Sequence, residues 1–243
     1  MLKINILRPT IFPPNITSGI TFSNYKLFPN GFSAYKLAHN SDAEVMLNRE
    51  ILASNIGCDT SALVFQKQVH SNYIRIIGTE QQKLEESDGF ISNNSGLALC
   101  INLADCAGIL CYDPLTQCIA AFHSGWKGTV AQIVPKGIAM MREEYGAKPS
   151  NILVYITPCA GKEKYEVGED VAKHFPNHRT AIGGGKYLLD LKGAIVAQLR
   201  DAGVDTEHNL EVSSVCTISN DNFHSFRRDG DNAGRMTAFI LIK

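Results

Sequence analysis

The chain has 243 residues, 19% of them charged, and a formal net charge of −1, which is typical of a soluble globular protein with a sizeable core. Its 23 basic and 24 acidic residues argue against nucleic acid as a main partner, because that needs a concentrated basic face. Seven irregularly spaced cysteines indicate reduced thiols and a cytoplasmic protein. Prolines interrupt the first fifteen residues, so we expect neither a signal peptide nor a membrane span.

Strands and helices are predicted to be mixed throughout the chain. Ser41 and Glu44 form a capping box that opens a helix over 42–56. A second helical pattern follows Gly125 and runs to about Tyr145, and Pro135 should kink or break it near Val134. Other helices are expected at 166–175 and 190–202, and strands at 1–7, 16–22, 62–69, 72–77, 97–104, 107–112, 118–123, 151–158, 210–214 and 236–242. This mixture predicts an α/β protein, and no composition break divides residues 1–243 into more than one domain.

Three residues stand at the ends of apolar, strand-like runs: His70, Cys106 and His123. Two imidazoles and one thiolate match the ligands of a catalytic zinc site that keeps its fourth position open. The chain lacks a short CxxC-type motif, and a single histidine at a strand end is more often structural than a ligand. Spacing alone therefore leaves both interpretations open.

Asp105 interrupts an otherwise apolar segment, and a buried carboxylate is costly unless it is paired. It could orient a ligand histidine, bind a substrate hydroxyl, or be a satisfied turn residue. The glycine-rich turn after His123 contains Lys127 and could hold a phosphate, although such turns are more often structural.

Two basic groups are candidates for contact with phosphate or ribose. Asn48 and Arg49 lie in the first predicted helix, and Arg227 and Arg228 precede an Asp-Gly pair. An arginine can offer a fork of donors to a phosphate. The alternative for the arginine pair is a solvated turn with local ion pairs.

Six short motifs occur in a characteristic order: KQVH (67–70), LADC (103–106), HSGWKG (123–128), YEVG (165–168), CT (216–217) and SFRRDG with a later GR (225–235). In these the chain resembles the YfiH family of laccase-domain proteins, long labelled multicopper polyphenol oxidoreductases. Ser124 and Lys127 depart from the family pattern, which has Ala and Arg there. The change at Lys127 puts in doubt any role that needs a guanidinium at this position.

The resemblance implies a layered mixed β-sheet core flanked by helices, with zinc held by His70, Cys106 and His123. It also implies phosphorolysis of adenosine, inosine, guanosine and S-methyl-5′-thioadenosine by inorganic phosphate, together with zinc-dependent adenosine deamination. Substrate contacts are then expected among Asn48, Arg49, Asp105, Arg227 and Arg228. Both a monomer and a homodimer remain open.

Three other interpretations compete with this one. A metal-free hydrolase or deamidase would use Cys106 as nucleophile and His123 as base. A copper-dependent polyphenol oxidase would place copper at the same thiolate and imidazoles, but seven histidines are too few for the several copper sites of a multicopper oxidase. A binding protein would use the metal only structurally, which requires a fourth ligand.

Overall fold

Two large β-sheets lie face to face in the computed structural model, which describes residues 2–37, 40–78 and 85–243. Residue 1 of the first expected strand lies outside this range. The five-stranded sheet has the order β1 (Ile6–Leu7), β2 (Ile16–Thr21), β14 (Met236–Ile242), β6 (Ala98–Leu103) and β3 (Leu63–Val64). The six-stranded sheet has the order β13 (Leu210–Val212), β9 (Leu153–Ile156), β7 (Ala107–Asp113), β8 (Cys118–Ser124), β5 (Gly89–Ser92) and β4 (Ile74–Ile76).

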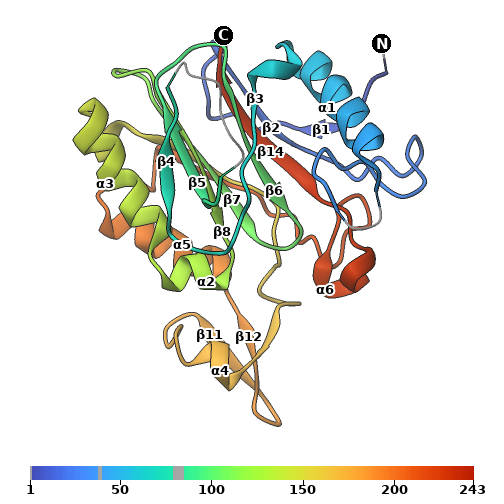
Figure 1. Ribbon diagram of the computed structural model, residues 1–243. Helices are drawn as coiled ribbons and strands as arrows, with labels where there is room; N and C mark the ends of the chain where they lie inside the picture. The colour runs from blue at the N-terminus through green and yellow to red at the C-terminus, as the bar shows by residue number, and fades with distance from the viewer. Residues whose placement is uncertain (1, 38–39, 79–84) are drawn as a thin grey trace.

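Helices cover the outer faces of both sheets, which makes four layers (Figure 1). Helix α1 (Asp42–Ile56) packs on the five-stranded sheet, while α3 (Ile133–Tyr145) and α5 (Leu191–Asp201) pack on the six-stranded sheet. The layers confirm the expected α/β class with a mixed-sheet core. Short 3₁₀ turns occur at Thr60–Ala62, Pro149–Asn151 and Gly230–Asn232.

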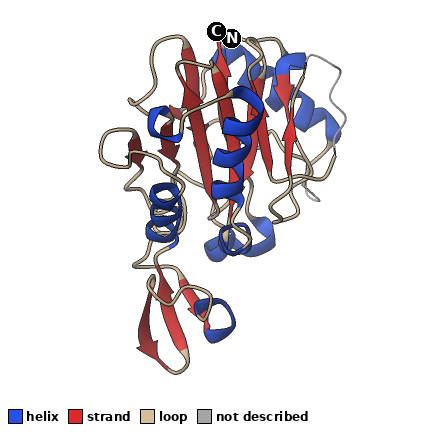
Figure 2. Ribbon diagram, turned by 90° about the vertical axis from the view of Figure 1, so that its left-hand side faces the viewer, coloured by secondary structure: helices blue, strands red, loops and turns tan. Residues whose placement is uncertain are grey.

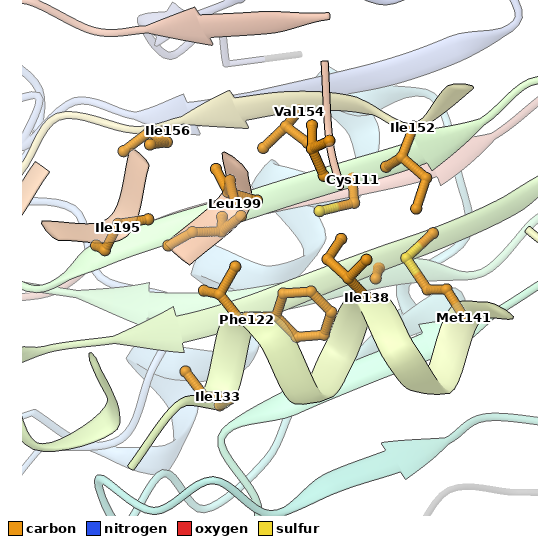
Figure 3. Packing of buried hydrophobic residues seen from close by; sticks show 14 of the residues in the cluster. Cys111, Phe122, Ile133, Ile138, Met141, Ile152, Val154, Ile156, Ile195 and Leu199 are labelled. Carbon is orange, nitrogen blue, oxygen red and sulfur yellow. The ribbon is translucent and has the colours of Figure 1, made fainter. Parts of the chain in front are cut away.

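Strand β7 shows why its sequence is continuously apolar. Its residues alternate between two buried faces: Ile109 and Cys111 face α3 and α5, while Leu110 and Tyr112 face the other sheet. A strand that is covered on both sides needs apolar residues at every position. Figure 3 shows Cys111 and its neighbours on the helix-facing side.

A third, smaller sheet projects from the body as an arm (Figures 1 and 2). It consists of β10 (Glu166–Gly168), β12 (Lys186–Leu189) and β11 (Arg179–Gly183), with the short helix α4 (Glu169–Ala172). The predicted helix over 166–175 is therefore wrong outside α4. Glu166 and Val167 pair with β12, and the helix begins only after Gly168.

The first helix is confirmed, and the second divides into two. Ser41 and Glu44 form the predicted capping box of α1. The helical pattern predicted after Gly125 breaks between α2 (Trp126–Val130) and α3, where Gln132 has a left-handed backbone with φ of 60°. Pro135 lies in the first turn of α3, where an amide donor is not needed.

The strand predicted over 62–69 is wrong beyond Val64. Lys67 forms only an isolated bridge with Glu86, and the side-chain amide of Gln68 bonds the backbone of Asn102 instead of a strand partner. Strand β5 and helix α6 (Phe226–Asp229) are further elements that the sequence patterns did not predict.

Replacing Gly137 with Ala is expected to destabilise the protein, although Ala normally stabilises a helix by about 1 kcal/mol relative to Gly. A Cβ at Gly137 would lie 2.6 Å and 2.7 Å from Cε1 and Cε2 of Phe122, whose ring is fully buried beneath α3. Forcing extra volume into such a core costs about 1–3 kcal/mol. Urea unfolding should show this loss, whereas Glu144→Ala on the exposed side of α3 should change stability by less than about 0.5 kcal/mol.

Candidate metal centre and its pocket

His70, Cys106 and His123 meet at one end of the two sheets. Their ligand atoms all lie within 4.8 Å of one another, and the two imidazole rings form an edge-on pair with centroids 4.8 Å apart. His70 belongs to the loop between β3 and β4, and Cys106 to the turn that joins β6 to β7. His123 ends up beside them because β8 pairs with β7, with Gly108 opposite His123.

Asp88, directly before β5, connects two of these three residues. Its Oδ1 lies 2.7 Å from Nδ1 of His123 and accepts the backbone N–H of His70 at 3.0 Å. Its Oδ2 accepts the backbone N–H groups of Val69 and Ser71 at 3.2 Å and 2.7 Å, and the Ser71 hydroxyl at 2.8 Å. The side chain is fully buried, so protein donors replace the water that a carboxylate would otherwise hold.

These contacts make the centre electrostatically suited to a cation. Burial opposes ionisation of Asp88, but hydrogen bonds from His123 and Ser71 outweigh it and lower the carboxyl pKa to about 2. Burial likewise opposes a Cys106 thiolate, but His123 and His70 hold the thiol pKa below its usual value. The pKa of His123 is raised, because Cys106 and Asp88 offset the cost of burying an imidazolium. A thiolate is the form of cysteine that binds metals.

Asp105 has the structure of a satisfied turn residue. Its carboxylate accepts hydrogen bonds from the Thr217 hydroxyl, the Ser225 hydroxyl and the backbone N–H of Arg227, at 2.6, 3.0 and 2.6 Å. The backbone of Asp105 is left-handed, with φ of 77°. The carboxylate that contacts a histidine of the cluster is Asp88, which sequence reasoning missed because it lies in a polar Ser-Asp-Gly turn.

A cavity of about 560 Å³ opens directly beside the three residues. Aromatic side chains form much of its wall, namely Tyr35, Trp126, Tyr165 and Phe226, and three cationic side chains reach it, namely Lys127, Arg227 and Arg235. Asn102 also lines the cavity, and its buried Nδ2 has no hydrogen-bond partner among the described residues. The cavity therefore combines aromatic faces with positively charged side chains.

The predicted substrate residues divide into two groups. Arg227 reaches the cavity, where its guanidinium lies 5.4 Å from the ring centroid of Tyr165 and donates to the carbonyl of Glu166. Arg228 points elsewhere and donates to the carboxylate of Asp229 and the carbonyls of Thr217 and Phe223.

Asn48 and Arg49 are not part of the cavity wall. Asn48 donates to the carbonyl of Ser33, and Arg49 donates to the carbonyl of Ala34 and lies over the ring of Phe65. Both side chains tie α1 to the segment before it. The structure thus brings Arg227 and Asp105 to the cavity and leaves the other three candidates outside it.

Several cavity residues were missed from the sequence alone. Tyr35 lies in a loop without a motif, while Trp126, Tyr165 and Arg235 belong to the motifs HSGWKG, YEVG and GR but were given no role. Tyr165 reaches the cavity from the base of the arm, a placement that depends on the third sheet.

The residues present fit a tetrahedral metal ion. They supply one sulfur and two imidazole nitrogens, all within 4.8 Å of one another, and the centre lies at the cavity wall, where a fourth position would face the cavity. Within the described ranges, no other group of three or more His, Cys, Asp or Glu side chains is arranged to hold a metal. This donor set accommodates one metal ion, not several.

The sequence model of the family described as multi-copper polyphenol oxidoreductase laccase matches residues 19–243. The chain belongs to this family. It is 32% identical over 223 residues to the purine nucleoside phosphorylase YlmD of Bacillus subtilis, covering 84% of this chain and 80% of that protein. It is 36% identical over 201 residues to a purine nucleoside phosphorylase of Deinococcus radiodurans, covering 79% and 75%.

Solved structures agree with this assignment. YfiH of Bacillus licheniformis superposes with a TM-score of 0.88 at 28% identity, covering 94% of this chain and 93% of that one. YlmD of Geobacillus stearothermophilus gives a TM-score of 0.87 at 26% identity, covering 95% and 93%. These matches confirm the predicted YfiH-like family and its layered fold. In the described part of the chain, no helix is long and apolar enough to cross a membrane.

Proposed function

We propose that the protein is a zinc-dependent purine nucleoside phosphorylase that also deaminates adenosine. The observation that carries the proposal is the His70–Cys106–His123 centre opening into a cavity with aromatic walls and cationic side chains. The substrates would be adenosine, inosine, guanosine and S-methyl-5′-thioadenosine, with inorganic phosphate as the second substrate. Relatives named purine nucleoside phosphorylase support this class of reaction.

Phosphorolysis requires an anion to attack the anomeric carbon of ribose while the bond to the purine breaks. Arg227, Arg235 and Lys127 are the cationic side chains at the cavity, and we assign phosphate binding to them, with Arg227 as the main contact. Holding the phosphate in line with the glycosidic bond would supply much of the rate acceleration. In the transition state, positive charge develops on the ribose while the attacking phosphate still carries most of its negative charge. The same cationic side chains would stabilise that phosphate.

The purine and ribose need flat apolar surfaces and a few directed donors. Trp126, Tyr165, Phe226 and Tyr35 offer aromatic faces of this kind. Gln68 and Asn102 add amide side chains to the same wall. We assign nucleoside recognition to this wall, and we leave Asn48, Arg49 and Arg228 with the structural contacts described above.

Zinc at His70, Cys106 and His123 would supply Lewis acidity to the cavity and so support both activities. Cys106 contributes a thiolate, and Asp88 keeps Nδ1 of His123 occupied so that Nε2 can serve as the ligand. We further propose that residues 1–243 act as one domain in the cytoplasm, as a monomer or homodimer.

The test is to incubate protein of known metal content with adenosine, with and without inorganic phosphate. Adenine and ribose 1-phosphate should form only when phosphate is present, and inosine should form without it. Both activities should disappear after chelation and return with zinc. Absence of all three products from zinc-loaded protein, with adenosine and then with the other nucleosides, would contradict the proposal.

A second candidate is a cysteine hydrolase or deamidase that needs no metal. It is favoured by the arrangement of Cys106, His123 and Asp88, in which a carboxylate orients the base beside a thiol of lowered pKa. Such an enzyme would keep its activity after thorough chelation and lose it to a thiol reagent. Restoration of phosphorolysis by zinc would eliminate this candidate.

The third candidate is a copper-dependent oxidase. The donor atoms of the cluster suit copper, but a multicopper oxidase needs more than one metal site. Copper can bind a thiolate and two imidazoles, yet the described residues offer only this one cluster. Copper-loaded protein should therefore show no turnover of phenols, and metal analysis of the protein as purified should find zinc.

A further inference from the structure

We propose that Asp88 is the positioning residue of the metal centre, because its one carboxylate holds both His70 and His123 in ligand geometry. Asp88 is not a ligand itself, since both its oxygens are engaged by protein donors. The inference rests on the proposed zinc site but not on the nucleoside substrates.

The loop that carries His70 is held in an unfavourable backbone conformation. His70 has φ of 61°, a left-handed value that residues other than glycine seldom adopt. Three successive backbone N–H groups, those of Val69, His70 and Ser71, converge on the Asp88 carboxylate. Consecutive amides that curve around one anion form a nest. We infer that the charge of Asp88 keeps this loop, and with it the His70 imidazole, in place.

His123 is held by Asp88 at two points. Its Nδ1 lies 2.7 Å from Oδ1 of Asp88, and its backbone N–H donates to the Asp88 carbonyl at 2.7 Å. The ring contact fixes Nδ1 as the donor, so Nε2 keeps a free lone pair for the metal. The backbone contact extends the pairing of β5 with β8, where Gly89 lies opposite Phe122.

A single atom joins the two histidines. Oδ1 of Asp88 accepts both from the backbone of His70 and from the ring of His123. Asp88 cannot move to suit one of them, because its side chain is fully buried and its own N–H donates to the carbonyl of Tyr73. The geometry of the two nitrogen ligands is therefore set before a metal arrives.

The neighbouring buried carboxylate does not share this role. Asp105 precedes Cys106, but its carboxylate bonds Thr217, Ser225 and the backbone of Arg227, none of which is a ligand. The loss of charge at Asp88 should therefore act on both histidines at once, in a way that no other described carboxylate can reproduce.

Asp88→Asn is the direct test, because asparagine has the same size but only one accepting oxygen. With its amide nitrogen at the Oδ1 position, asparagine would lose the contacts to both His70 and His123. With the nitrogen at the Oδ2 position it would turn a donor toward the N–H groups of Val69 and Ser71, which hold the His70 loop. Zinc affinity, measured by competition with a chelator, should fall about 10- to 100-fold. The visible absorption of the cobalt-substituted protein should change as well, since it reports ligand geometry. Unchanged affinity and an unchanged cobalt spectrum would overturn the inference.

Two further variants separate positioning from general damage. Asp113→Asn removes another fully buried carboxylate, at the far end of the β7–β8 hairpin, and should leave zinc affinity and the cobalt spectrum unchanged. Ser71→Ala removes the hydroxyl bond to Oδ2 of Asp88 and the acceptor of the Tyr73 backbone N–H, keeps the Asp88 carboxylate, and should weaken zinc binding about threefold. If Asp88→Asn does not fold, a Ser71→Ala protein that binds zinc as tightly as the unaltered protein would overturn the inference.

The outcomes also separate this inference from the proposed enzyme activity. Tight zinc binding that depends on Asp88, without phosphorolysis, would contradict only the proposed reaction. Phosphorolysis and zinc binding that do not respond to Asp88→Asn would contradict only the positioning role. If the unaltered protein binds no zinc, the proposed metal centre and the role of Asp88 both fail.

Discussion

Cys106→Ala is expected to abolish zinc binding and phosphorolysis together. Cys106 supplies the only sulfur of the centre, and two imidazoles alone leave a zinc ion with half of its usual ligands. Loss of an outer-shell partner already weakens metal binding about 10- to 100-fold, so loss of a ligand should cost on the order of 10³-fold or more. Metal analysis of the purified variant and the release of adenine in phosphate buffer measure the two effects.

Cys58→Ala is the matched control for this variant. Cys58 is also a half-buried free cysteine, but it packs beside α1 in the cluster beneath the five-stranded sheet, away from the centre. This variant should keep its zinc content and its activity. A Cys106→Ala protein with full activity and no metal would refute a zinc-dependent reaction, and inactivity with a full complement of zinc would assign Cys106 a role other than ligand.

The sequence predicted the elements whose signals are local. The capping box of Ser41 and Glu44 placed α1 correctly, because a helix start is decided within one turn of chain. Strand β7 was likewise visible as an apolar run. The arm was not predicted, because whether Glu166 and Val167 form a strand depends on pairing with β12, more than fifteen residues away. Pairing between distant segments leaves little trace in local composition.

The candidate site shows the same division. His70, Cys106 and His123 were recognised because each ends an apolar run within a distinctive motif, and the structure brings their ligand atoms together. Asp88 was missed, because its importance comes from donors on the 69–71 loop and on β8. For Asp105 the sequence left three roles open, and the structure gives it that of a satisfied turn residue, because its partners lie more than 100 residues further along the chain.

Arg227→Met is expected to raise the KM for phosphate by about 10- to 100-fold, because a hydrogen bond to a charged group contributes about 1.5–3 kcal/mol. Arg227 is exposed at the cavity, and within the described part of the chain its guanidinium donates only to the Glu166 carbonyl. The remaining donors can turn to a phosphate. Initial rates at varied phosphate and saturating nucleoside measure this effect, and Arg227→Lys should restore part of the affinity because it keeps the charge.

Arg228→Met is the matched comparison for Arg227→Met, because the hydrogen-bond donors of Arg228 bind groups of the protein itself. Its guanidinium bonds both carboxylate oxygens of Asp229 and the carbonyls of Thr217 and Phe223. Removing it leaves those acceptors unpaired, so the free energy of unfolding should fall by about 1–3 kcal/mol. The KM for phosphate should change by less than about threefold, since its guanidinium does not reach the cavity. If Arg228→Met raises the KM and Arg227→Met only destabilises the fold, the assignment of phosphate binding to Arg227 is wrong. Arg228 would then bind phosphate and Arg227 would stabilise the fold, which is the opposite of what their hydrogen bonds indicate.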